Sequence, residues 1–164
     1  MRYSHDFIVI GSGIAGLTFA LKISEFGSVA LIAKDSLEEG ATRYAQGGIA
    51  SVMADDDSSD LHVSDTLEAG RGLCKEDVVR CIIKEGPGHV RDLIDLGARF
   101  NRNPDDTFAL GKEGGHSKRR ILHAGDLTGW EIESTLIRAV RAKPQIEIFT
   151  HHTVVDFITL ANLD

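Results

Sequence analysis

A glycine-rich stretch near the start of the chain, 11-GSGIAG-16, has the spacing of a turn that holds a pyrophosphate. Gly11 would permit a tight turn, Gly13 would let a phosphate approach the backbone, and Gly16 would let a helix pack closely on a strand. The free N–H groups at the start of that helix would favour an anion. A purely structural glycine turn is the alternative, because the motif on its own is weakly specific.

The segments on either side of this turn are those that a dinucleotide site requires. Residues 6–10 form a short apolar run typical of a buried parallel strand, and residues 14–26 have the apolar spacing of a helix, capped by Gly27. Residues 28–33 predict a second buried strand. Strand, glycine turn, helix and strand make a βαβ unit, so the sequence predicts an α/β fold with a parallel sheet and a bound dinucleotide.

Lys34 follows the second predicted strand, where the NAD-binding form of this unit has an acidic residue. That acid accepts a hydrogen bond from a ribose hydroxyl, and a lysine has donors only. We therefore expect Lys34 to contact a phosphate or a ribose oxygen. Plain NAD is disfavoured, and a flavin nucleotide or NADP is favoured.

The rest of the chain predicts helices and strands separated by long loops. Loops are expected at 34–59 and 101–126, and loops of this length are usually functional or disordered. Pro87 is expected to interrupt a helical pattern, and Gly97 to cap its second part. The expected helices are residues 60–69, 75–85, 87–96 and a segment from Asp126 or Thr128 to about 142. The expected strands are residues 145–150 and 153–160.

Composition limits the classes of function. The chain has 164 residues, the length of one domain, and its net charge of −7 argues against nucleic acid as the main partner. It has no apolar run as long as a membrane span and no signal-peptide pattern, so we expect a cytoplasmic protein. Cys74 and Cys81 fit neither a redox pair nor a zinc site and are expected to be reduced thiols, with no metal bound.

Four stretches together resemble the L-aspartate oxidase family of FAD enzymes, which belongs to the succinate dehydrogenase and fumarate reductase flavoprotein superfamily. The stretches are 11-GSGIAGL-17, 42-TRYAQGGIA-50, 65-DTLEAGRGLC-74 and 113-EGGHSKRRILHAGDLTG-129. The resemblance runs from about residue 6 to about residue 156 and implies a Rossmann-like FAD-binding domain. Members of this family also typically carry a lysine at the position of Lys34.

The resemblance implies which residues hold the FAD. The glycine turn would hold the pyrophosphate, and Lys34 would contact the adenosine end. Residues 41–48 would lie along the ribityl chain and the isoalloxazine ring, where paired glycines suit a close approach of the backbone. A mobile loop tip is the alternative for the two adjacent glycines. The implied cofactor-binding residues are Gly11, Ser12, Gly13, Ile14, Ala15, Gly16, Lys34, Ala41, Thr42, Arg43, Tyr44, Ala45, Gln46, Gly47 and Gly48.

Two positions distinguish the branches of this superfamily. The dehydrogenases have a histidine bonded covalently to the flavin at the position of Ala41, so the FAD is expected to be bound noncovalently here. Glu113 matches the glutamate that faces the substrate amino group in the oxidase family. Its carboxylate would pair with an ammonium group and would disfavour succinate by repulsion. A solvated loop glutamate is the alternative.

A basic cluster follows Glu113, and we favour a structural role for it. Recognition of a dicarboxylate by Arg and His is the other interpretation. We expect Arg120 and His123 to bind backbone or to pair with Asp126, because the family's substrate arginines and catalytic histidine lie further along its chain. The cluster consists of His116, Arg119, Arg120 and His123. The isolated histidines lack the spacing of a metal site and are expected to be structural or solvent-facing: His62, His89, His151 and His152.

The activity implied by the resemblance is FAD-dependent oxidation of L-aspartate to iminoaspartate, with oxygen or fumarate as the electron acceptor. In that family the product passes to quinolinate synthase in de novo NAD biosynthesis. The family's complete enzyme is far longer and adds a capping domain and a helical C-terminal domain. We therefore expect residues 1–164 to be the N-terminal part of an FAD-binding domain, incomplete at its C-terminus and inactive alone. A succinate dehydrogenase or fumarate reductase-like fragment and a noncatalytic FAD-binding remnant are the alternatives.

Overall fold

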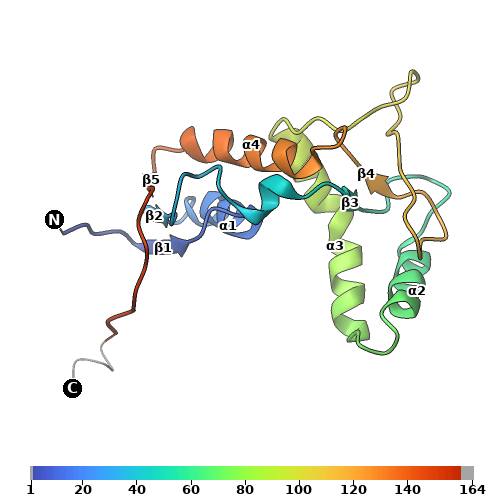
Figure 1. The fold of residues 1–164 in the computed structure, drawn as a ribbon, viewed down its shortest axis with the longest axis horizontal. Helices are drawn as coiled ribbons and strands as arrows, with labels where there is room; N and C mark the ends of the chain where they lie inside the picture. Colours follow the sequence, from blue (N-terminus) through green and yellow to red (C-terminus); the bar gives the residue numbers. More distant parts are fainter. Residues whose placement is uncertain (1, 160–164) are drawn as a thin grey trace. The chain divides into compact units, whose positions relative to one another are not determined.

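The structure is a computed structural model, and it describes residues 2–159. The chain divides into two compact units, each of which is described by itself. The first consists of Met1–Ala41 and Leu136–Asp164, and the second of Thr42–Thr135. Figure 1 shows the order of the elements along the chain.

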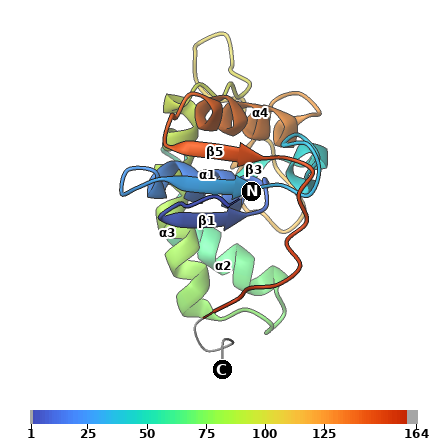
Figure 2. The ribbon, with the colours of Figure 1, turned by 90° about the vertical axis from the view of Figure 1, so that its left-hand side faces the viewer.

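The first unit is built on a parallel three-stranded sheet. Its order is β1 (Phe7–Ile10), β2 (Val29–Ile32) and β5 (Ile146–Phe149), with β2 in the middle, as Figure 2 shows. The helix α1 (Ile14–Ile23) connects β1 to β2 and packs against both strands. The predicted βαβ unit and α/β fold are therefore confirmed.

Apolar side chains from β2 and α1 form the buried interior of this unit. Val29 and Leu31 of β2 and Leu17 of α1 have no exposed surface, and burying such a side chain contributes about 1.5–3 kcal/mol. Leu17 and Ala20 lie one helical turn apart, so α1 turns a single face to the sheet. The middle strand is covered on both sides, which is why its sequence is continuously apolar.

α1 ends at Ile23, before the end that the sequence predicted, and Gly27 is not its cap. Gly27 instead lies against Asp6, where a Cβ atom would be 2.7 Å from the carboxylate Oδ2. That carboxylate accepts hydrogen bonds from the backbone N–H and the hydroxyl of Ser28, at 2.8 and 2.7 Å. The close packing of this turn on Asp6 is what requires a residue without a side chain.

The strand predicted at residues 153–160 is wrong for residues 153–159, which form no regular element. Residue 160 lies outside the described residues. Val155 and Ile158 are 93% and 83% exposed. Within residues 2–159 no strand pairs with this segment, and a β-prone sequence forms a strand only where a neighbour satisfies its backbone.

The second unit contains two packed helices and a short antiparallel strand pair. The helix α2 begins after Ser58, whose hydroxyl caps it by accepting a hydrogen bond from the backbone N–H of Leu61 at 3.2 Å. α2 packs against α3, and β3 pairs with β4. The helix α4 begins in this unit and ends in the first. The elements are η1 (Ala41–Tyr44), β3 (Ile49–Ala50), α2 (Ser59–Ala69), α3 (Glu76–Asp95), β4 (Ile121–Leu122) and α4 (Thr128–Arg141).

α3 continues through Pro87, so the predicted interruption at this residue is wrong. Its buried side chains recur at helical spacing along one continuous face: Ile83, Val90 and Leu93. Burial of this face offsets the hydrogen bond that proline cannot donate. The predicted cap at Gly97 is confirmed: its φ is +102°, and its N–H donates to the carbonyl of Ile94 at 2.8 Å.

Within residues 2–159 the thiols and the acidic and imidazole groups form no evident metal centre. Cys74 and Cys81 are free, as the sequence predicted. No group of three or more His, Cys, Asp or Glu side chains in this part of the chain is arranged to hold a metal ion. None of the helices in the same range is both long and apolar enough to span a lipid bilayer.

Candidate functional site

The glycine turn of the first unit lies at the carboxyl end of β1. Gly11 has a φ of +104°, in the left-handed region that favours glycine, and its N–H donates to the carbonyl of Ile32 at 2.8 Å. A Cβ atom at Gly16 would overlap the carbonyl oxygen of Gly11. α1 therefore starts directly against the turn, which is the close packing that the sequence predicted for Gly16.

The N-terminus of α1 suits an anion. Gly13 is the residue before the helix, with extended backbone angles, and no side chain among residues 2–159 caps the helix there. The first turn carries no acidic residue. The helix dipole and the N–H groups of the first turn therefore attract a negative group. Ile14 and Ala15 are exposed at this end, whereas Ser12 is buried.

Lys34 lies at the same end of the sheet as the glycine turn. The strands are parallel, and the hydrogen bond from Gly11 to Ile32 joins the turn to the end of β2, just before Lys34. Lys34 is exposed. The neighbouring Asp35 lies 3.4 Å from the ring of His151. The positive charge of Lys34 fits a phosphate-bearing ligand, and the specific contact with the adenosine end stays a prediction.

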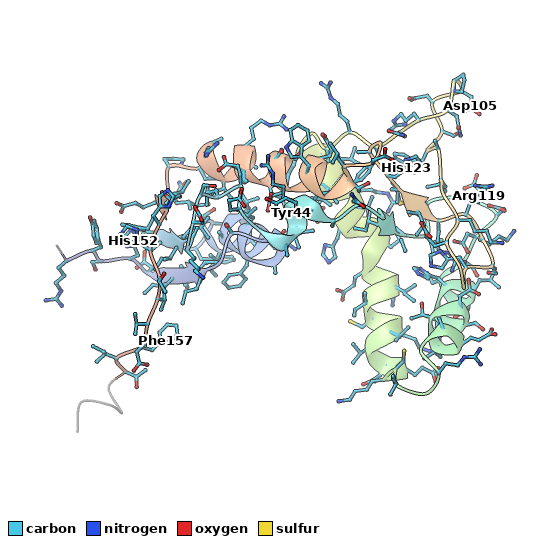
Figure 3. All side chains as sticks on the ribbon, in the orientation of Figure 1. Tyr44, Asp105, Arg119, His123, His152 and Phe157 are labelled. Carbon is cyan, nitrogen blue, oxygen red and sulfur yellow. The ribbon has the colours of Figure 1, made fainter. Side chains whose placement is uncertain are left out.

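Residues 41–48 include an exposed stretch whose backbone is held by α4. Residues 44–48 are exposed, and Tyr44 is labelled in Figure 3. Gly129, in the first turn of α4, donates its N–H to the carbonyl of Ala45 at 2.9 Å. A Cβ atom at Gly129 would overlap the carbonyl oxygen of Thr42. The support of this segment by Gly129 could not be predicted from the sequence beyond the presence of a glycine in the first turn of a helix.

The two adjacent glycines have different environments. Gly48 has a φ of +107°, and a Cβ atom there would lie 2.6 Å from both Ile121 Cγ2 and the carbonyl oxygen of Leu122. At Gly47 a Cβ atom would meet no described atom within 4 Å. Gly48 is therefore required by the packing on β4, whereas Gly47 borders open space. The open space at Gly47 leaves room for a planar group, so contact of this residue with the isoalloxazine ring stays a prediction.

Glu113 lies in an exposed loop that is closed at its base by Gly111 and Ile121. Their backbones exchange hydrogen bonds of 2.8 and 3.1 Å. Within the loop, the N–H of His116 donates to the carbonyl of Glu113 at 3.2 Å. The side chain of Glu113 makes no ion pair among residues 2–159, so its carboxylate is available to an external cation. Recognition of a substrate amino group stays a prediction.

Arg120 follows this loop and lies in a buried ion network. Its side chain and that of Asp57 have no exposed surface. The guanidinium donates from Nε and Nη2 to the two carboxylate oxygens of Asp57, both at 2.8 Å, and from Nη1 to Oδ2 of Asp65 at 2.6 Å. The predicted structural role of Arg120 is confirmed. The predicted partner Asp126 is wrong, because Asp57 and Asp65 occupy the guanidinium.

Asp65 is held in its charged form by this network. Burial acts to raise the pKa of Asp65, but hydrogen bonds from Ser117 and Arg120 and the charge of Arg120 outweigh it and lower the pKa. No local sequence pattern predicted this network. The acidic stretch at residues 55–60 has the composition of a solvated loop, and only folding brings Asp57 to Arg120.

The other members of the basic cluster lie on or beside the same loop. Arg119 and His123 flank β4, as Figure 3 shows. Arg119 is exposed, and its Nη1 lies at 3.5 Å from the carbonyl of Leu110. The ring of His123 lies 3.2 Å from the side-chain amide of Asn101. These contacts are those of loop anchors.

His62 of α2 and His116 of the loop meet edge to face, with ring centroids 5.9 Å apart. The Nδ1 atoms of both rings are buried and have no hydrogen-bond partner among residues 2–159. Burial, followed by the nearby charge of Arg120, lowers the pKa of His62. His62 is therefore structural, whereas His89 and His151 face solvent, and both cases agree with the expectation of structural or solvent-facing histidines.

Comparison with known proteins identifies the family to which these segments belong. Residues 6–162 match the family described as the FAD binding domain. The chain belongs to the FAD-binding domain family. The cofactor of this family is FAD, and within the first unit the turn at residues 11–16 and the exposed cation of Lys34 fit such a ligand.

Named relatives give a finer comparison. The chain is 49% identical over 154 residues to L-aspartate oxidase 2-a, chloroplastic, of Nicotiana tabacum, covering 94% of this chain and 24% of that protein. It is 43% identical over 165 residues to L-aspartate oxidase of Pseudomonas aeruginosa, covering 96% of this chain and 31% of that protein. Among solved structures, quinol fumarate reductase of E. coli superposes with a TM-score of 0.90 at 32% identity, and the superposition covers 95% of this chain and 27% of that chain. The chain thus spans between a quarter and a third of the length of the curated relatives it matches.

Proposed function

We propose that the chain supplies the FAD-binding part of an enzyme that oxidises L-aspartate to iminoaspartate. The observation that carries this proposal is the identity of 43–49% to proteins named L-aspartate oxidase, over 94–96% of the chain. The matched stretch covers 94–96% of the chain, so it includes the glycine turn, the exposed segment at residues 41–48 and the loop of Glu113. We also propose quinolinate synthase as the enzyme that consumes the product.

The bound FAD would accept the two electrons that leave the substrate. The residues of this chain bind and orient it: the turn at 11–16 takes the pyrophosphate at the start of α1, and Lys34 neutralises part of its charge. Residues 41–48 lie along the ring, with Gly47 leaving room for it. Ala41 cannot form a bond to the flavin, so the cofactor is held noncovalently.

Glu113 gives the proposed enzyme its preference for an amino acid. Its exposed carboxylate would bind the ammonium group of L-aspartate and repel a dicarboxylate that lacks this group. In the reaction the Cα–H bond and one N–H bond break and a C=N bond forms, so two electrons and two protons leave the substrate. Oxygen, giving hydrogen peroxide, or fumarate, giving succinate, takes them up.

Oxidation of succinate or reduction of fumarate is the second candidate function. The superposition on quinol fumarate reductase, with a TM-score of 0.90, favours it. Two residues count against it. Ala41 cannot form the covalent bond that the histidine of the dehydrogenases makes to the flavin. The carboxylate of Glu113 would repel the two carboxylates of succinate or fumarate.

Anaerobic reduction of the flavin distinguishes the two functions. The protein, in the length that its gene encodes and loaded with FAD, is mixed with L-aspartate or with succinate, and the bleaching of the flavin absorbance is followed. We expect L-aspartate to reduce the flavin and succinate to leave it oxidised. Reduction by succinate alone would overturn the proposal in favour of the second function. Glu113→Gln should weaken the response to L-aspartate, and Glu68→Gln, on the exposed face of α2, is the control.

A further inference from the structure

The loop that carries Glu113 is fastened to α2 through a single carboxylate oxygen. Oδ2 of Asp65 accepts hydrogen bonds from the backbone N–H and the hydroxyl of Ser117, at 2.8 and 2.9 Å. The same oxygen accepts from Nη1 of Arg120 at 2.6 Å. Three donors from one short stretch of chain therefore converge on one side chain of a neighbouring helix.

The loop has other restraints, and its attachment to Asp65 is the point at which most donors converge. Nζ of Lys118 donates to Oδ2 of Asp56 at 2.8 Å, and the ring of His116 packs edge to face on that of His62. The base of the loop is closed by backbone bonds between Gly111 and Ile121, and Nζ of Lys112 donates to the carbonyl of Ser117 at 3.1 Å. Gly115 has a φ of +88°, and a Cβ atom there would lie 3.6 Å from that of Ala69. The tip thus approaches the C-terminal end of α2 without a side chain between them.

Asp65 is itself firmly held. It lies in the middle of α2, and the guanidinium that it binds is also bound at two points by the buried Asp57. Hydrogen bonds to charged groups stabilise more than neutral ones and impose a direction. The position of Asp65 is therefore transmitted to Ser117 and, through the turn from His116 to Glu113, to the loop tip.

We propose that Asp65 and Ser117 are positioning residues, which hold the Glu113 carboxylate where it distinguishes an amino acid from the same dicarboxylate without its amino group. This inference rests on the proposed function. An exposed carboxylate on an unrestrained loop would bind an ammonium group in many orientations, and a displacement of about 1 Å in such a group can cost ~100-fold in rate. Ser117 supplies such a restraint through its two hydrogen bonds to Asp65.

Two variants separate positioning from stability. Ser117→Ala removes the hydroxyl bond to Asp65 but keeps the backbone bond, and Asp65→Asn removes the charge that all three donors share. Ser117→Thr keeps a hydroxyl and should restore the wild-type behaviour. Ser64→Ala, an exposed serine beside Asp65 on α2, is the matched control.

The readouts are kcat and KM for L-aspartate, reduction of the flavin by succinate, and the thermal midpoint, all with the FAD-loaded protein. We expect Ser117→Ala to raise the KM for L-aspartate by about 10-fold, with kcat less affected and the flavin spectrum and midpoint unchanged. The preference for L-aspartate over succinate should fall in the same variant. A folded Ser117→Ala protein with wild-type KM and preference would overturn the inference. If the wild-type protein itself fails to oxidise L-aspartate, the proposed function fails instead.

Discussion

Replacement of Arg120 by methionine should destabilise the protein severely. Methionine has a similar length and would leave two carboxylates without their cation. The side chain of Asp57 has no exposed surface and that of Asp65 is only 13% exposed, so water cannot replace the guanidinium. Removal of one partner from a buried ion pair costs about 3–5 kcal/mol. Since a domain is stable by about 5–15 kcal/mol, this loss is a large part of the total.

Equilibrium unfolding in urea measures this loss directly. The expected decrease in the free energy of unfolding for Arg120→Met is about 3–5 kcal/mol at neutral pH. Arg119→Met is the matched control, because Arg119 is the neighbouring arginine and is exposed, and it should change the free energy by less than about 0.5 kcal/mol. Addition of Asp57→Asn and Asp65→Asn to Arg120→Met should recover part of the loss, because no uncompensated charge then remains buried.

At acid pH the free energies of unfolding of Arg120→Met and the wild-type protein should differ less than at neutral pH. In the wild-type protein the pKa of Asp65 is lowered despite its burial, so the stability that this carboxylate contributes is present above about pH 4 and disappears as the pH falls further. In the variant the carboxylate would be easier to protonate, which relieves the buried charge. A loss below about 1 kcal/mol at neutral pH, or a loss equal to that of Arg119→Met, would refute the buried network.

Three further substitutions test separate parts of the structure. Burial lowers the pKa of His62, so the unfolded chain binds more protons, and stability should decrease as the pH falls below about 6.5. His62→Gln should flatten this slope in a pH series of unfolding curves, and an unchanged slope would contradict the burial of this ring. Gly129→Ala should cost about 1–3 kcal/mol in urea unfolding, because its Cβ atom would overlap a backbone carbonyl; no loss would show that η1 can move away. Gly88 lies in the exposed middle of α3, and a Cβ atom there would meet no described atom within 4 Å. Gly88→Ala should therefore raise the free energy of unfolding by about 0.5–1 kcal/mol and with it the thermal midpoint. A lower midpoint would contradict a helix at this position.

Local patterns predicted the first unit well, because its signals lie close together in the sequence. The apolar run of β1, the glycine turn and the start of α1 are consecutive in the sequence. The residues that make the turn and the close packing therefore lie within a few positions of one another. The turn at Gly11 and the close packing at Gly16 followed from these signals. The end of α1 did not, because Gly27 serves a contact with Asp6, which precedes β1.

The errors elsewhere come from interactions that no local pattern contains. A proline normally ends a helix, but the buried face of α3 continues on both sides of Pro87 and outweighs the lost bond. Residues 153–159 are rich in the β-branched and aromatic residues that favour a strand, but no strand pairs with them among the described residues. The partners of Arg120 lie more than fifty positions earlier in the chain, so charge and proximity in sequence pointed to Asp126 instead.

The most direct test of the central claim is a titration of the protein, in the length that its gene encodes and freed of flavin, with FAD, followed by quenching of the flavin fluorescence. We predict saturable binding that Gly16→Val abolishes, because its side chain would collide with the turn at Gly11. Acid precipitation of the loaded protein should then release all the flavin, because Ala41 offers no group for a covalent bond. Absence of saturable binding, binding unaffected by Gly16→Val, or flavin retained in the precipitate would contradict the account.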